Sequence, residues 1–174
     1  MATIRPLNAT DAVPYWHLRL EALETEPWAF GSSAEDHRLT TPEQKAPQLR
    51  DDPNGNFMLG AWDGDRLVGM VGFVRENGLK RRHRGGVVAV YVTPEFRGLG
   101  LGRRMMTQLI DRAKSYGDLE TITLGVIAQD TAAKLLYKSL GFTVYGHERN
   151  ALKINGEYVD EDLMELVLID PNTR

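Results

Sequence analysis

The segment "VYVTPEFRGLGLGRRMM", residues 90–106, joins an apolar run to a run with helical spacing. Glycine stands at three alternate positions of this junction, Gly98, Gly100 and Gly102. Glycine adopts positive φ angles and lets a ligand approach the main chain closely. The free amides at a helix N-terminus carry partial positive charge and bind anions. The segment therefore predicts a phosphate-binding loop between a strand and a helix.

Two common phosphate-binding motifs do not fit this segment. A P-loop requires a Lys-Ser or Lys-Thr pair after its last glycine, and none is present here. A dinucleotide fingerprint, G-x-G-x-x-G, would require glycine at the positions of Arg103 or Met105. The spacing that does occur is Arg97-x-x-Gly100-x-Gly102. A nucleotide-binding regulator, one alternative function, is therefore disfavoured.

The composition is that of a globular protein. The chain has 174 residues, of which 42% are hydrophobic and 26% charged, so we expect a single domain over residues 1–174. The net charge of −3 argues against nucleic acid as a partner, and the basic run Lys80–Arg84 is interpreted as a solvated hairpin loop. The absence of cysteine excludes disulfides and thiolate nucleophiles and fits a cytoplasmic location.

We expect neither a metal site nor a membrane segment. The four histidines lack metal-ligand spacing. The apolar run Leu67–Val74 is far shorter than the ~20 residues that span a bilayer.

The hydrophobic periodicity predicts strands and helices that alternate along the chain, which favours an α/β or α+β class with a mixed sheet. Strands are expected at residues 3–7, 57–62, 66–76, 85–92 and 121–128, followed by a final hairpin that turns at 154–157. Helices are expected to begin near Asp11, at Thr41 or Thr40, near Leu99 and near Asp130, with Asp11 and Asp130 as caps.

The strand, glycine loop and helix together resemble the acetyl-CoA pyrophosphate loop of the GNAT superfamily of N-acetyltransferases. A second segment resembles the motif N-x-x-A-x-x-L-Y-x-x-x-G-F of the same family. The matching residues are Asp130, Ala133, Leu136, Tyr137, Gly141 and Phe142. Asp130 replaces the usual asparagine, so it can cap the helix, but an amide contact to the cofactor is not implied.

The resemblance covers nearly the whole chain and is to the bacterial stand-alone type. It implies the GNAT fold, a mixed sheet of about six to seven strands flanked by about four helices. It also implies transfer of acetyl from acetyl-CoA to a primary amine by direct attack. The acceptor is then a small-molecule or protein amine. A homodimer is also implied, through the apolar alternation of residues 163–169. A non-catalytic acyl-CoA-binding module of the same fold is the alternative, and the presence of Tyr137 argues for the enzyme.

The resemblance also implies roles for individual residues. The amides that surround the pyrophosphate are those of Leu99, Gly100, Leu101, Gly102 and Arg103, with Arg97 beside them. Tyr91 and Val92 offer backbone hydrogen bonds to the pantetheine, and Asp130 and Ala133 begin the next helix along the cofactor. Tyr137 is the general acid that protonates the leaving thiolate, since a phenol with a pKa of ~10 keeps its proton at neutral pH.

The sequence offers several candidates for the general base. The candidates are Glu26, Glu35, His83, Asp160, Asp162 and a chain of water molecules. Trp28 and Phe30 lie in the segment "PWAFGSS". They form either a lid on the core or one wall of the acceptor pocket.

Overall fold

A computed structural model describes residues 1–52 and 55–169 of the chain. It contains seven strands and five α-helices within the described residues, together with short 3-10 turns. In chain order these are β1 (Thr3–Pro6), α1 (Ala12–Thr25), α2 (Ala34–Arg38), α3 (Pro42–Lys45), β2 (Phe57–Asp63), β3 (Arg66–Arg75), β4 (Arg84–Val92), α4 (Leu101–Lys114), β5 (Thr121–Ile127), α5 (Thr131–Ser139), β6 (Thr143–Ile154) and β7 (Glu157–Val167). The predicted mixed α/β class is confirmed.

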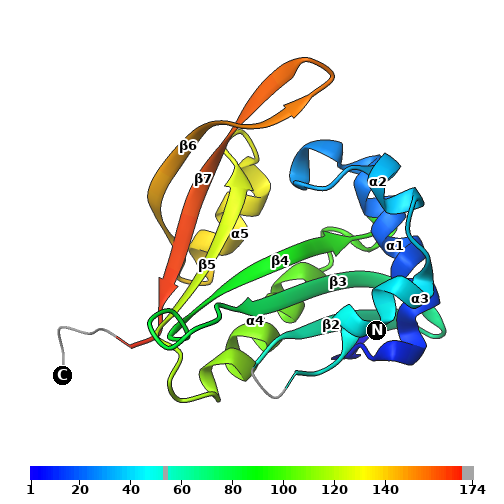
Figure 1. Cartoon of the computed structure of the whole chain (residues 1–174), viewed down its shortest axis with the longest axis horizontal. Helices are drawn as coiled ribbons and strands as arrows, with labels where there is room; N and C mark the ends of the chain where they lie inside the picture. The colour runs from blue at the N-terminus through cyan, green and yellow to red at the C-terminus, as the bar shows by residue number, and fades with distance from the viewer. Residues whose placement is uncertain (53–54, 170–174) are drawn as a thin grey trace.

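The strands form one sheet in the order β1-β2-β3-β4-β5-β7-β6. β4 and β5 pair in parallel, and the other five pairs are antiparallel. The parallel pairing covers only Arg84–Gly86 and Thr121–Thr123. Beyond these residues the two halves of the sheet diverge, as Figure 1 shows. The centre of the sheet is therefore open along most of β4 and β5.

Positive φ angles explain where the predicted turns form. Asn155 and Gly156 join β6 to β7 with φ angles of 51° and 87°, as a two-residue hairpin requires. Gly141 ends α5 with a φ of 96°. The prediction that the side chain of Asp11 caps α1 is wrong. This carboxylate instead accepts hydrogen bonds from Arg5 and from the amide of Asn8.

The two faces of the sheet bury separate apolar clusters. Leu59 and the α4 residues Met105, Met106 and Leu109 belong to one cluster. Met58, adjacent to Leu59, belongs to the other, together with residues of α1. Adjacent strand residues point to opposite faces, so helices cover the sheet on both sides. Among the described residues no helix is long and apolar enough to cross a membrane.

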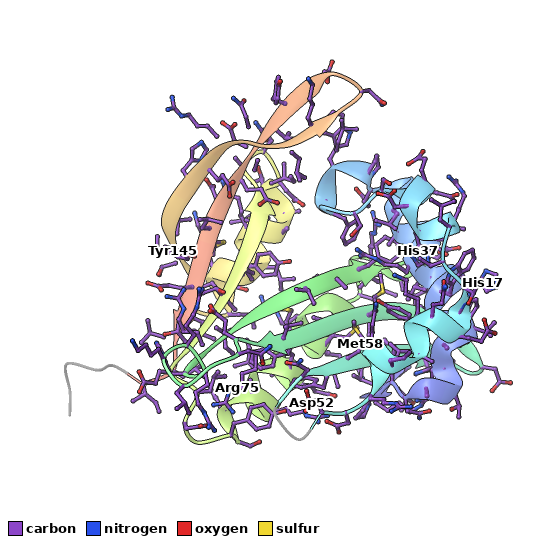
Figure 2. The ribbon with its side chains drawn as sticks, viewed as in Figure 1. His17, His37, Asp52, Met58, Arg75 and Tyr145 are labelled. Atoms are coloured by element: carbon purple, nitrogen blue, oxygen red, sulfur yellow. The ribbon has the colours of Figure 1, made fainter. Side chains whose placement is uncertain are left out.

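The last strands differ from the expectation. β7, which contains most of the apolar run 163–169, lies between β5 and β6, so both of its edges are paired. The outer strand on this side is β6. It exposes Val144 and Tyr145, which are 45% and 48% accessible, and Figure 2 shows Tyr145 on the outside of the molecule.

Gly85, which pairs with Ile122 of β5, has no space for a Cβ atom on the side of β3. A Cβ at Gly85 would lie 2.2 Å from Cζ of Phe73 and 3.1 Å from the carbonyl oxygen of Val74. A Cβ at the adjacent Gly86 meets nothing closer than 3.8 Å. The ring of Phe73 is fully buried and has no space to move away.

We therefore expect Gly85→Ala to lower the free energy of unfolding by about 1–3 kcal/mol, the usual cost of overpacking. Its matched control, Gly86→Ala, should change this free energy by less than about 0.5 kcal/mol. Urea denaturation of both variants measures the difference. Equal stability of the two variants would contradict the close packing at Gly85.

Candidate active site

The divergence of β4 from β5 opens a cavity of about 1020 Å³. Both strands line it, together with the starts of α4 and α5 and part of the segment that follows α1. A bulge in β4 lies in its wall, since the pairing with β3 shifts register between Met70 and Gly72. Ala89 lies in this bulge with a φ of 55°, unusual for a residue other than glycine. A long slot thus crosses the middle of the sheet.

The glycine loop forms one end of this slot. Gly98 and Gly100 have φ angles of 74° and 75°, and α4 begins directly after Gly100 without a side-chain cap. In contrast, Ser33, Thr41 and Asp130 cap α2, α3 and α5 with their side chains. The amides of the first turn of α4 are therefore free for an anion. This geometry fits the pyrophosphate of acetyl-CoA, as the sequence predicts.

The structure brings ten of the eleven residues predicted for the site to the lining of this one cavity. These are Tyr91, Val92, Arg97, Gly100, Leu101, Gly102, Arg103, Asp130, Ala133 and Tyr137. Leu99 is the exception, because it is 73% exposed and lies outside the lining. Residues that are up to 46 positions apart in the sequence thus share one site.

Arg97 lines the cavity, and its side chain also contacts neighbouring groups of the protein. Its Nε donates to the carbonyl of Val92 at 2.9 Å, and its guanidinium pairs with Glu26 at 2.7 Å. The guanidinium also lies 5.5 Å from the ring centre of Tyr91. Arg97 therefore fixes the segment after α1 to the end of β4, and Glu26 is ion-paired rather than free as a base.

Asp130 precedes the first residue of α5, and Tyr137 lies in its last turn. Asp130 accepts a hydrogen bond from the amide of Ala133 at 2.9 Å, so the prediction that it caps this helix is confirmed. Tyr137 is 7% exposed and packs edge-on against Phe142. Burial, with a smaller effect from the charge of Asp130, raises the pKa of Tyr137 above its usual value of 10.0. Its hydroxyl therefore keeps its proton at neutral pH.

Four of the five residues considered as a base lie outside the cavity lining. Glu35 is exposed on α2, and His83 lies in the turn before β4. Asp160 and Asp162 both contact His147, and Asp162 also pairs with Lys134. The candidates on β7 thus hold the last two strands and α5 together. Within the described residues no group of three or more histidines and acids could hold a metal ion.

Two charged residues near the cavity carried no signal in the sequence. The carboxylate of Glu161, on β7, lies against Gly125 in the cavity wall. Burial, together with the charge of Glu148, raises the pKa of Glu161. Arg19, on α1 near the other end of the sequence, also lines the cavity. Neither belongs to a motif, and only the folded chain brings them to the slot.

The segment after α1 supplies one aromatic wall. Phe30 is 9% exposed and lines the cavity. Trp28 is half-buried and lies outside the lining. Of the two aromatic residues, Phe30 alone therefore lines the cavity, and a role as a wall of the acceptor pocket stays a prediction.

Known proteins share this fold. A solved structure from Salmonella typhimurium, described as a putative acetyltransferase with its cofactor acetyl-CoA, superimposes with a TM-score of 0.84. It is 25% identical, and the match covers 98% of this chain and 95% of that one. The L-amino acid N-acyltransferase MnaT of Escherichia coli is 35% identical over 80 residues, which is 46% of each chain.

A third relative is the N-alpha-acetyltransferase RimI of Mycobacterium tuberculosis, which is 33% identical over 58% of this chain and 61% of its own. The chain thus matches about half of the length of these curated relatives. The family model of the acetyltransferase (GNAT) family matches residues 17–142, from within α1 to just past the end of α5. The chain belongs to the acetyltransferase (GNAT) family, whose members use acetyl-CoA.

Proposed function

We propose that this protein transfers the acetyl group of acetyl-CoA to a primary amine. The observation that carries the proposal is the shared cavity: the uncapped start of α4 and the buried hydroxyl of Tyr137 line the same slot. A binding module needs the first of these features and has no use for the second. We expect the reaction to take place in the cytoplasm, in keeping with a sequence that lacks cysteine.

The chemistry assigns a distinct task to each end of the slot. The amides of Gly102 and its neighbours hold the pyrophosphate, and the open edges of β4 and β5 face the pantetheine. The neutral amine attacks the thioester carbon, so that a C–N bond forms and the C–S bond breaks. Tyr137 donates its proton to the departing sulfur. Only about one amine in 10³ is neutral at pH 7, so water in the cavity first takes a proton from the ammonium form. The nitrogen loses a second proton when the amide forms, and water returns a proton to Tyr137.

The relatives indicate two kinds of acceptor. One relative is named for L-amino acids and another for N-alpha-acetylation. Both groups of acceptor present a primary amine, either on a small molecule or on a protein. A non-catalytic acyl-CoA-binding module remains the second candidate, which a thiol-release assay over an amine panel separates from the enzyme.

The first prediction concerns the binding of acetyl-CoA. Gly100 is a poor position for the test, because its positive φ strains any side chain. A Cβ at Gly102 makes ordinary contacts of 3.7 Å and 4.0 Å, and its φ is not positive. Gly102→Leu should therefore fold normally, fill part of the slot and weaken acetyl-CoA binding by about tenfold or more, or ~1.4 kcal/mol. Isothermal calorimetry measures the affinity.

The matched control for this prediction is Thr107→Leu, on the exposed side of the same helix. Its affinity should equal that of the wild type. Unchanged binding by a folded Gly102→Leu protein would show that the pyrophosphate lies elsewhere.

The second prediction concerns Tyr137 as general acid. Tyr137→Phe keeps the ring and its contact with Phe142 but removes the proton. We expect kcat to fall by about 10²- to 10⁴-fold, the usual contribution of a general acid, while the affinity for acetyl-CoA stays the same. Because burial raises the pKa of Tyr137, the wild-type kcat should not decline up to about pH 10. A loss confined to KM would assign the hydroxyl to binding instead.

We also propose that the protein forms a homodimer, and the exposed outer strand β6 supports an interface there. An unpaired edge with Val144 and Tyr145 accessible is a surface that a second copy can extend. Light scattering should give twice the chain mass of 19.5 kDa. Val144→Lys places a charge on this strand and should shift the mass to that of a monomer. A wild-type protein that is monomeric at high concentration would contradict the proposal.

A further inference from the structure

Arg19, on α1, lies where the acetyl-CoA slot meets a second cavity of about 700 Å³. The two cavities share the residues Arg19, Gly31, Ser32, Val88 and Ala89 in their linings. The second cavity is lined by residues of α1, α2 and α3 and of β2, β3 and β4. His37 and Met58, labelled in Figure 2, line it from α2 and from β2. The second cavity is therefore placed beside the slot, on the side of α1.

Arg19 has no acidic partner in the part of the chain that the structure describes. Its Nη1 is buried and makes no hydrogen bond, and its guanidinium stacks 4.5 Å from the ring centre of Phe30. Burial lowers the pKa of this guanidinium, which shows the cost of holding the charge there. Buried charges are normally paired, because an unpaired one costs free energy. An arginine held in this way between two cavities is suited to bind an anion that arrives with a ligand.

The charges around the second cavity also favour an anion. Lys45 lines it along with Arg19, and Asp36 is the single acid of its described lining. His37 contributes no positive charge, because burial, with the charges of Lys45 and Arg19, lowers its pKa. Its Nε2 lies 2.9 Å from the carbonyl of Trp16, to which it donates as a neutral ring. The cavity therefore carries an excess of positive charge.

We propose that Arg19 binds the carboxylate of the acceptor, so that the acceptor is a free amino acid rather than a simple amine, a polyamine or a protein chain. This inference rests on the proposed function and narrows its substrate. A guanidinium binds a carboxylate through two parallel hydrogen bonds. A carboxylate held at the junction leaves the amino group on the side of the slot, two bonds from the carboxylate carbon, and the second cavity takes the side chain. The carboxylate itself is unchanged while the C–N bond forms and the C–S bond breaks.

Arg19 and Lys45 also discriminate against polyamines. A polyamine would bring further positive charge into a cavity that already contains two cations and one acid. A peptide with a free N-terminal amine carries an amide where the amino acid carries its carboxylate, so it leaves the guanidinium unpaired.

The experiment is a thiol-release assay with acetyl-CoA and matched acceptors. Each amino acid is compared with its decarboxylated amine, for example phenylalanine with 2-phenylethylamine and methionine with 3-(methylthio)propylamine. Spermidine and a short peptide with N-terminal alanine complete the panel. We expect the best amino acid to exceed its amine in kcat/KM by about 10- to 100-fold, the range of one charge-assisted interaction.

Arg19→Met should remove most of this difference, mainly through KM for the amino acid, and leave the Kd for acetyl-CoA unchanged. The variant should be at least as stable to heat as the wild type, because it removes an unpaired buried charge. The matched control is Arg38→Met, since Arg38 pairs with Glu24 away from both cavities. This control should keep the preference for the amino acid over its decarboxylated amine.

The outcomes distinguish a failure of the role of Arg19 from a failure of the acetyltransferase activity. The role of Arg19 is overturned if amino acids and their amines are acetylated equally well, or if Arg19→Met keeps the preference for the amino acid. Either result still supports the acetyltransferase activity. A loss of acetyl-CoA affinity in Arg19→Met overturns it as well, because Arg19 then serves the cofactor. Absence of thiol release with every acceptor, together with absence of acetyl-CoA binding, overturns the proposed function itself.

Discussion

The site depends on the early end of hydrogen bonding between β4 and β5. Three residues of each strand pair, and then the strands separate. In a continuous sheet each backbone amide and carbonyl finds a partner on the next strand. Here the remaining edges of β4 and β5 stay open on the facing sides, which is the arrangement that an extended ligand can complete. The slot is thus a consequence of sheet topology before any side chain is considered.

The other elements hold this opening in place. α4 packs on β2, β3 and β4 with buried methionines and leucine, and its first turn is directed to the slot by the loop that follows β4. The ion pair of Arg97 with Glu26 connects that loop to the segment after α1. Such an exposed pair adds little to global stability. Its position at the rim of the slot gives it a local role, since it fixes two segments that both line the site.

The two cavities differ in the groups that they present to a ligand. The slot offers free backbone amides and open strand edges, which fit a long cofactor with a phosphate end. The second cavity offers Arg19 and Lys45 over an apolar floor that includes Met58. In our proposal, the junction at Arg19 and Phe30 sets the distance between the carboxylate of the acceptor and the thioester. Selectivity for the acceptor would then depend on this junction, and recognition of the cofactor on the glycine loop.

The sequence by itself determined the local features. Three alternate glycines between a strand and a helix define the anion loop, and Asp130, Tyr137 and Gly141 define a capped helix, because each of these signals acts over a few residues. The positions of most strands and turns follow from the same short-range rules, although Asp11 was assigned the wrong partner. The tertiary structure alone decided where β4 and β5 part, that Arg97 is engaged by Glu26, and that Arg19 and Glu161 stand beside the slot. These features arise from contacts between segments distant in the chain, and no local pattern of residues encodes such contacts.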